Sequence, residues 1–201
     1  ENYCYMPGPR EMRRLFRAGK LGAFEYGEGE YMHNCEPIWP DITGGRPDHW
    51  RNRMSAAYYC THSLGPLIHI TGLRPVRVSG FELPHNARMA RMGARAGAAA
   101  VEMVTFENGA MVKSLHGVGI SRNSVWYSVY GSKGQIDTAR ECASAEGVGR
   151  VHVSLDAREG ENNFSYETYC PSDALADAAQ GYGHGNSDFY TSYHFVEKIM
   201  G

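Results

Sequence analysis

After Gly72 the sequence changes from helical periodicity to a series of strand-like segments, and this change constrains the fold more than any other feature. In one segment Val151, Val153 and Leu155 alternate with polar residues, which is typical of a half-buried strand. The segment 125–130 is the one richest in β-branched and aromatic residues. We expect strands at residues 75–83, 98–107, 110–118, 124–131 and 150–156.

The dipeptide Asn108-Gly109 separates two of these segments. Both residue types tolerate the positive φ angles of a type I′ turn, so the pair predicts a tight β-hairpin. Strands joined in this way pair in antiparallel fashion.

The first part of the chain mixes helical and extended patterns. We expect a helix at 8–19, a strand at 23–33 and a long loop at 34–50. A helix should follow at about 52–71, interrupted at Gly65-Pro66 because proline lacks a backbone donor. A final helix is expected at 187–200. Together with the strands, this order predicts an α+β fold with a largely antiparallel sheet.

Composition excludes several classes of protein. The chain has 201 residues, of which 42% are hydrophobic and 21% charged, so it is neither disordered nor a membrane span. A net charge of −2 gives no basic field for nucleic acid. The cysteines are odd in number, and no two have C-x-x-C spacing; we expect free thiols in a reducing, cytoplasmic compartment. They are Cys4, Cys35, Cys60, Cys142 and Cys170.

Motifs for cofactors and metals are weak. Gly117-Val118-Gly119 lacks a third glycine and a following helix, and no predicted strand leads into the glycines at 181–185. We therefore expect no dinucleotide site within this chain. On a helix His62 and His69 would lie about 10 Å apart, too far to share one ion. No metal site is predicted, although scattered ligands remain possible.

The segment 58–66 contains the best candidate for acid–base chemistry. On a helix, Tyr58 and Tyr59 both fall next to His62, whose ordinary pKa leaves two protonation states accessible near neutrality. Periodicity alone also allows a structural histidine that is hydrogen-bonded to a backbone carbonyl, and on periodicity alone this alternative is favoured.

Five further residues are candidates for contacts with a substrate. Tyr31 and His33 project from one face of the expected strand. Trp50 and Arg51 could stack on a sugar ring and bond its hydroxyls, or Trp50 could belong to the core. His184 lies among glycines that allow close approach, just before a helix that Ser187 or Asn186 could cap.

At these residues the chain resembles the C-terminal domain of the Gfo/Idh/MocA oxidoreductases, and more narrowly the branch that contains glycoside hydrolase family 109. The motif Tyr59-Cys60-Thr61-His62-Ser63-Leu64-Gly65-Pro66 is fairly specific, and the matches cover nearly the whole chain in the family's order. The other matching stretches are Glu1–Tyr5, Gly19–Gly22, Glu28–His33, Trp50-Arg51 and Gly183–Phe189.

The resemblance implies that residues 1–201 form a single substrate-binding and dimerisation domain with an open-faced sheet, and that Glu1 lies just past a Rossmann domain. It implies NAD or NADP in the full-length protein, bound by that other domain and not by this chain alone. The substrate would be a sugar or polyol, and the free face of the sheet would pair two copies in a homo-oligomer.

The resemblance also assigns roles. His62 matches the acid/base histidine and Tyr59 the tyrosine before it; Tyr31, His33, Trp50, Arg51 and His184 would contact substrate. Many family dehydrogenases carry aspartate where this chain has Tyr58, a departure that favours the family 109-like branch. The competing hypothesis is a non-catalytic module that binds carbohydrate or pairs subunits. The catalytic hypothesis requires His62, Tyr59 and the 183–188 loop to converge.

Overall fold

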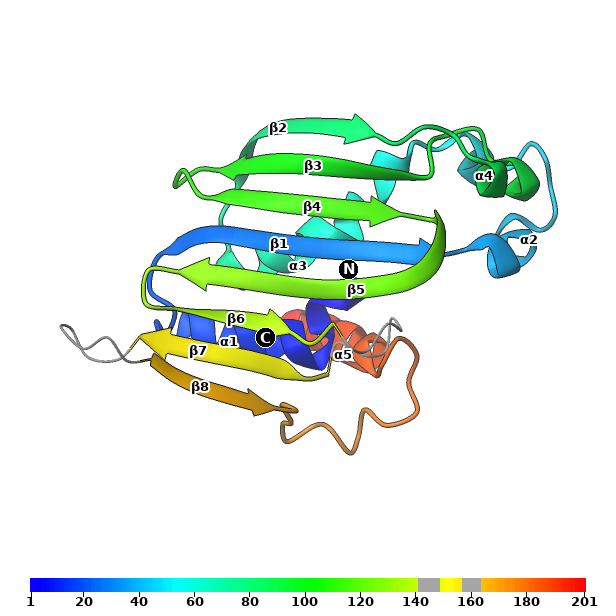
Figure 1. Cartoon of the computed structure of the whole chain (residues 1–201). Helices are drawn as coiled ribbons and strands as arrows, with labels where there is room; N and C mark the ends of the chain where they lie inside the picture. The colour runs from blue at the N-terminus through cyan, green and yellow to red at the C-terminus, as the bar shows by residue number, and fades with distance from the viewer. Residues whose placement is uncertain (141–148, 157–163) are drawn as a thin grey trace.

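The computed structural model describes residues 1–140, 149–156 and 164–201. An eight-stranded sheet has the order β2-β3-β4-β1-β5-β6-β7-β8 (Figure 1). β1 pairs with β4 in parallel, and the other neighbouring strands are antiparallel. The strands are β1 (Phe24–Asn34), β2 (Pro75–Glu82), β3 (Ala99–Phe106), β4 (Met111–Gly117), β5 (Gly119–Gly131), β6 (Gly134–Thr138), β7 (Val151–Asp156) and β8 (Phe164–Tyr169). The predicted α+β class with a largely antiparallel sheet is confirmed.

Three helices lie on one face of this sheet: α1 (Pro7–Arg17), α3 (Cys60–Thr71) and α5 (Ser187–Met200) (Figure 1). The core fills the space between helices and sheet, where Leu67 and Ile70 of α3 and Tyr127 and Ile136 of the sheet are fully buried. No helix among the described residues covers the opposite face, on which Phe81 is 78% exposed. The sheet is open-faced, as the resemblance implies.

Shorter helices complete the described chain. α2 (Trp39–Thr43) and α4 (Ala87–Met92) lie at one end of the sheet (Figure 1). Single 3₁₀ turns occur at η1 (Asn2–Tyr5), η2 (Glu36–Ile38), η3 (Trp50–Arg53) and η4 (Ala56–Tyr59). The segment 34–50, expected to be a loop, therefore contains α2. Its Trp39 is buried and donates from Nε1 to Asn52 Oδ1 at 2.8 Å, which anchors the segment to η3.

The helix expected at 52–71 differs from the structure in two ways. Only Cys60–Thr71 is α-helical, because η3 and η4 precede it as separate turns. The expected interruption at Gly65-Pro66 is wrong, since α3 continues through Pro66. Proline leaves the carbonyl four residues earlier without its helical donor. That carbonyl, of His62, accepts instead from Tyr127 Oη of β5 at 2.6 Å.

The hairpin predicted at Asn108-Gly109 joins β3 to β4, but its turn is not type I′. Gly109 has a positive φ of 88°, whereas Asn108 does not. Phe106 N donates to Ala110 O at 2.8 Å, so the loop has three residues and ends in a left-handed glycine. The Asn108 side chain donates to Phe24 O and accepts from Ala110 N, contacts that hold its conformation.

None of the helices in the described parts of the chain is long and apolar enough to cross a bilayer. The cysteines that the structure describes, namely Cys4, Cys35, Cys60 and Cys170, are free thiols. Cys142 lies outside the described residues.

Candidate functional site

His62 lies in the first turn of α3, within a cluster of tyrosine rings from three other elements. Its imidazole centroid is 4.4 Å from the ring of Tyr31 on β1, 5.0 Å from Tyr3 of η1 and 5.9 Å from Tyr59 of η4. These tyrosines are buried, while the His62 side chain keeps 23% exposure. The imidazole is therefore held on three sides and still reachable from solvent.

Two features hold the first turn of α3 close to the sheet, a glycine in β1 and a hydrogen bond from β5. Gly29 of β1 lies under the helix, where a Cβ atom would fall 1.9 Å from the Ser63 carbonyl oxygen. Only glycine allows this approach. The bond from Tyr127 Oη to the His62 carbonyl then fixes the first turn of α3 above β5.

A carboxylate also reaches His62. Glu1 Oε2 lies 2.7 Å from His62 Nδ1, an ion-pair distance, but the contact lacks hydrogen-bond geometry, and Nδ1 has no hydrogen-bond partner among the described residues. The second carboxylate oxygen, Oε1, accepts from Tyr3 N at 2.9 Å. The neighbour of His62 Nδ1 is thus a carboxylate, and His62 is not the carbonyl-bonded structural histidine that periodicity alone favoured.

Tyr59 connects His62 to Arg51 and Trp50. Arg51 Nη1 donates to Tyr59 Oη at 3.0 Å, and its guanidinium lies 4.7 Å from the Trp50 ring. Trp50 is 51% exposed, which excludes the core alternative for this residue. Burial raises the pKa of Tyr59, an effect that the nearby Arg51 charge opposes, so Tyr59 is a neutral phenol at pH 7.

Of the two phenols expected beside the imidazole, only Tyr59 lies there. Tyr58 is exposed, and its ring contacts Trp50 at 5.8 Å and Tyr59 at 6.3 Å. The expectation assumed an α-helix through Tyr58, whereas η4 is a 3₁₀ turn with a different angular spacing.

His33 and His184 approach the same region. His33 Nδ1 lies 2.9 Å from Cys35 Sγ, and the Tyr31 ring is 5.7 Å from the His33 ring. Burial lowers the pKa of His33, and the charges of His62 and His184 lower it further. The His33 imidazole on β1 therefore lies within electrostatic range of His62 on α3 and of His184 in the loop before α5.

The loop before α5 differs from expectation in its cap. Asn186 is the N-cap residue, but it has a left-handed φ of 67° and makes no side-chain cap bond. The Ser187 hydroxyl donates to the His184 carbonyl at 2.7 Å, so neither side chain caps the helix. His184 has a positive φ of 52°, is exposed, and pairs through Nδ1 with Asp188 at 2.8 Å.

A cluster of three buried polar side chains, which the sequence analysis did not predict, lies beneath His62. His116 Nδ1 is 3.0 Å from Ser63 Oγ and 3.2 Å from Ser114 Oγ, and all three side chains are fully buried. Burial lowers the pKa of His116 to about 4, with a further contribution from the His62 charge. A neutral His116 thus ties α3 to β4.

The predictions about metal and dinucleotide sites can be compared with the positions of the described residues. Among the described residues no group of three or more His, Cys, Asp or Glu side chains is arranged to hold a metal ion. β8 ends at Tyr169, well before the glycines that precede α5, so no strand in the described chain leads directly into that loop. A dinucleotide pyrophosphate is bound at a tight turn in which a strand leads through a short loop into a helix.

Comparison with solved structures finds close likeness in fold. Levoglucosan dehydrogenase in complex with NADH and levoglucosan matches with a TM-score of 0.72 at 17% identity, over 98% of this chain and 55% of that one. An inositol dehydrogenase homologue from Azotobacter vinelandii, in complex with NAD⁺, matches with a TM-score of 0.62 at 15% identity, over 92% and 44%. An oxidoreductase domain protein from Kribbella flavida matches with a TM-score of 0.64 at 21% identity, over 93% and 52%. The chain shares its fold with these oxidoreductases.

This chain spans about half the length of each of those oxidoreductases. No protein-family model matches the sequence, and no curated protein matches it. At these identities the likeness establishes the fold, and the chemistry has to be argued from the residues.

Sequence reasoning missed Glu1, Tyr3, Cys35 and Tyr127 as parts of the site. Glu1 and Tyr3 belong to a stretch that carries the family resemblance, and this was the only available signal for them. Tyr127 could have been sought from Pro66, because the carbonyl that a helical proline frees needs a donor from elsewhere.

Proposed function

We propose that this chain is the substrate-binding and oligomerisation domain of an NAD(P)-dependent, sugar-active oxidoreductase of the Gfo/Idh/MocA type. The cofactor would be bound by a nucleotide domain outside this chain. The observation that carries the proposal is the position of His62: partly exposed, surrounded by three tyrosine rings and paired with a carboxylate. The shared fold with enzymes crystallised with NAD⁺, NADH and levoglucosan supports it.

His62 would exchange the proton of the reacting hydroxyl. When a carbinol is oxidised its hydroxyl proton needs a base, and a histidine near neutral pH can both accept and return it. The bound cofactor would take up the hydride from carbon. Glu1 stabilises the imidazolium that forms, and Tyr59, held by Arg51, orients the substrate.

The remaining predicted residues would contact the sugar. Tyr31 presents its ring beside His62, His33 lies next to Tyr31, and His184 would reach the sugar from the loop before α5. The exposed Trp50 ring offers a flat apolar surface on which a pyranose can stack, with Arg51 available to bond hydroxyls.

Within the family we propose the branch that contains glycoside hydrolase family 109. Many dehydrogenases of the family have aspartate at the place of Tyr58, and here the exposed Tyr58 ring cannot supply a carboxylate. Glu1 supplies one to His62 from another part of the chain. In that branch the sugar is oxidised transiently at C3, the C2 proton and the C1 substituent are eliminated, water adds to the double bond, and the ketone is reduced again, so NAD is recycled.

Product analysis tests this function. The protein expressed with the region encoded upstream of Glu1 is incubated with NAD⁺ and a panel of sugars, polyols and aryl glycosides. Net oxidation is expected to accumulate NADH, whereas the family 109-like reaction releases the aglycone without net NADH. The 201-residue chain alone is the control and should do neither. An upstream-extended protein that transforms no compound of the panel would contradict the proposal.

We further propose that the open face of the sheet pairs two copies of the chain. Phe81 is 78% exposed there and Tyr166 63% exposed, and burying such side chains at an interface is favourable. Light scattering should report a dimer that Phe81→Glu dissociates, with Lys20→Gln, exposed in the loop after α1, as the control. A strict monomer would contradict this assignment.

A non-catalytic carbohydrate-binding module is the second candidate, favoured by the exposed Trp50 beside Arg51. The two functions separate experimentally, because a module would bind sugar through Trp50 and leave it unchanged.

A further inference from the structure

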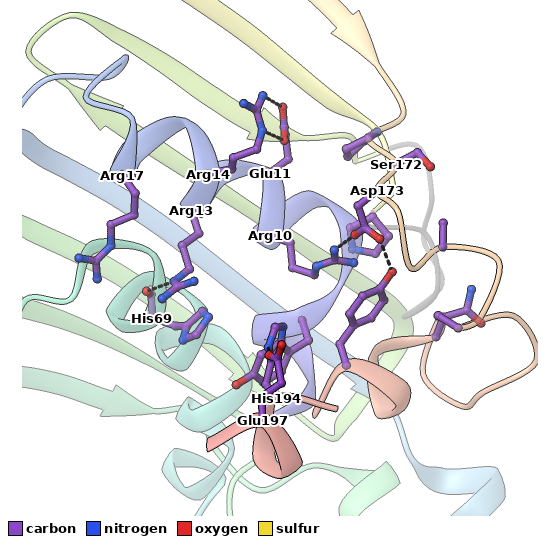
Figure 2. Close-up of a pocket in the computed structure, with 18 of the residues that line it drawn as sticks. Arg10, Glu11, Arg13, Arg14, Arg17, His69, Ser172, Asp173, His194 and Glu197 are labelled. Carbon is purple, nitrogen blue, oxygen red and sulfur yellow. Dashed lines mark hydrogen bonds and ion pairs between the residues drawn. The ribbon is translucent and has the colours of Figure 1, made fainter. Parts of the chain in front are cut away.

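A cavity of about 700 Å³ lies between α1 and α5 (Figure 2). His69, near the C-terminal end of α3, and the segment around Asp173 complete its wall. Neither His62 nor Tyr59 lines it. Its volume is within the range of small-molecule sites, about 300–1,000 Å³.

The charges that line the cavity are mainly positive. α1 contributes Arg10, Arg13, Arg14 and Arg17, whose spacing of three and four residues places them along one side of the helix. Lys198 of α5 brings the cationic side chains to five, against three acidic ones, although the whole chain carries a net charge of −2.

Each acidic side chain of the wall already has a cationic or hydroxyl partner. Asp173 pairs with Arg10 and accepts from Tyr190 Oη at 2.9 Å (Figure 2). Glu11 accepts two bonds from Arg14, both at 2.7 Å. The third acid, Glu197, lies 2.8 Å from His194 Nδ1.

Arg13, Arg17 and Lys198 make no ion pair with any residue that the structure describes. Arg13 donates from Nε to the His69 carbonyl at 3.3 Å, which leaves its two terminal nitrogens to bond a ligand. Figure 2 shows Arg13 and Arg17 extending from α1 toward the side on which His69 lies. Guanidinium groups bind phosphate through paired, charge-assisted hydrogen bonds.

The pKa of His69 reflects the burial and the positive charge in this cavity. Burial lowers its pKa to about 4, and the charges of Arg13, His194 and Arg17 lower it further. The imidazole therefore stays neutral beside these cations, and a bound anion would remove part of the penalty on its protonation.

We propose that this cavity binds the phosphate group of a small molecule, with Arg13 and Arg17 as its principal ligands and Lys198 as a third cation. Neither His62 nor Tyr59 contributes to this phosphate site, and the proposal does not depend on the sugar chemistry. The volume favours a phosphorylated metabolite over a peptide, and inorganic phosphate presents the same group.

Calorimetry on the 201-residue chain tests the site, with inorganic phosphate and glucose 6-phosphate as probes and glucose as the neutral control. Both phosphates should bind and glucose should not. Tighter binding of glucose 6-phosphate identifies a phosphorylated metabolite as the ligand, and tighter binding of phosphate identifies the free ion. If neither phosphate gives more heat of binding than glucose does, the proposal is overturned.

Variants locate the binding. Arg13→Gln and Arg17→Gln should each weaken binding by about tenfold or more, since charge-assisted bonds carry at least this much. Arg122→Gln, an exposed arginine outside the cavity, should leave it unchanged. These side chains are all exposed, so the variants should fold, and thermal melting is the measurement that checks this. Equal losses in all three variants would show nonspecific attraction and overturn the proposal.

The titration of His69 gives a second readout. Its imidazole proton resonance should titrate at higher pH with saturating phosphate than without it. An unchanged midpoint at saturation would place the anion elsewhere on the chain and contradict the proposed site.

Discussion

Replacing His62 with Gln in the protein that carries both domains should lower kcat by about 10²–10⁴-fold, the usual contribution of a general acid–base group. Glutamine occupies similar space and can donate a hydrogen bond, but it cannot accept a proton and return it. The fold should survive, because the imidazole is partly exposed and Nδ1 makes no hydrogen bond with the rest of the described structure. Steady-state kinetics with the best substrate of the panel measures the effect.

His152→Gln is the matched control, since His152 lies on β7 and contacts Thr168 at 2.8 Å, away from α3. It should retain the kcat of the wild type. A His62→Gln enzyme with kcat close to that of the His152→Gln enzyme would remove His62 from proton transfer. Thermal melting of both variants separates loss of chemistry from loss of fold.

Replacing Tyr127 with Phe should destabilise the chain by about 1–3 kcal/mol, the cost of leaving a buried polar group without its partner. Tyr127 is fully buried, and its hydroxyl donates to the His62 carbonyl at 2.6 Å. No helical N–H can replace that donor, because residue 66 is proline. Urea unfolding of the 201-residue chain measures the loss.

A second substitution makes this prediction specific. Pro66→Ala supplies an N–H four residues after His62, so in the Tyr127→Phe background it should recover much of the lost stability. Tyr26→Phe, whose hydroxyl contacts Glu28 on the open face, should cost less than Tyr127→Phe. Strictly additive effects of Tyr127→Phe and Pro66→Ala would contradict the idea that the tyrosine compensates for the proline.

Elements with strong local signals could be predicted from the sequence. α1 and α5 follow from apolar spacing and from the proline and glycine positions near their ends, and α5 matches its expected bounds of 187–200. The hairpin position follows from Asn108-Gly109, but its turn type depends on the contact from Asn108 to Phe24 O, made far along the chain.

Elements that depend on distant partners could not be predicted. β6 is short and alternates polar residues with the buried Ile136, so it lacks an apolar run of its own. The parallel pairing of β1 with β4 joins segments separated by β2 and β3, and local pattern says nothing about it. The continuity of α3 through Pro66 likewise depends on Tyr127 of another strand.

In the candidate site, too, local contacts could be predicted from the sequence and contacts between distant segments could not. The contact between Tyr59 and His62 follows from their spacing along the chain. The contacts from Glu1, Tyr3 and Tyr31 arise from tertiary packing of η1 and β1 against α3. The histidine could therefore be identified from the sequence, whereas most of the groups that set its environment could not.

The most direct test of the central claim is a rapid-mixing measurement of the reduced nicotinamide. The upstream-extended protein, loaded with NAD⁺, is mixed with its substrate and followed through the first turnover. Reduced nicotinamide should form within that turnover, whether the net reaction is oxidation or glycoside cleavage, and its formation should be slowed greatly by His62→Gln. Substrate that binds and leaves with no reduced nicotinamide formed at any time would contradict the account.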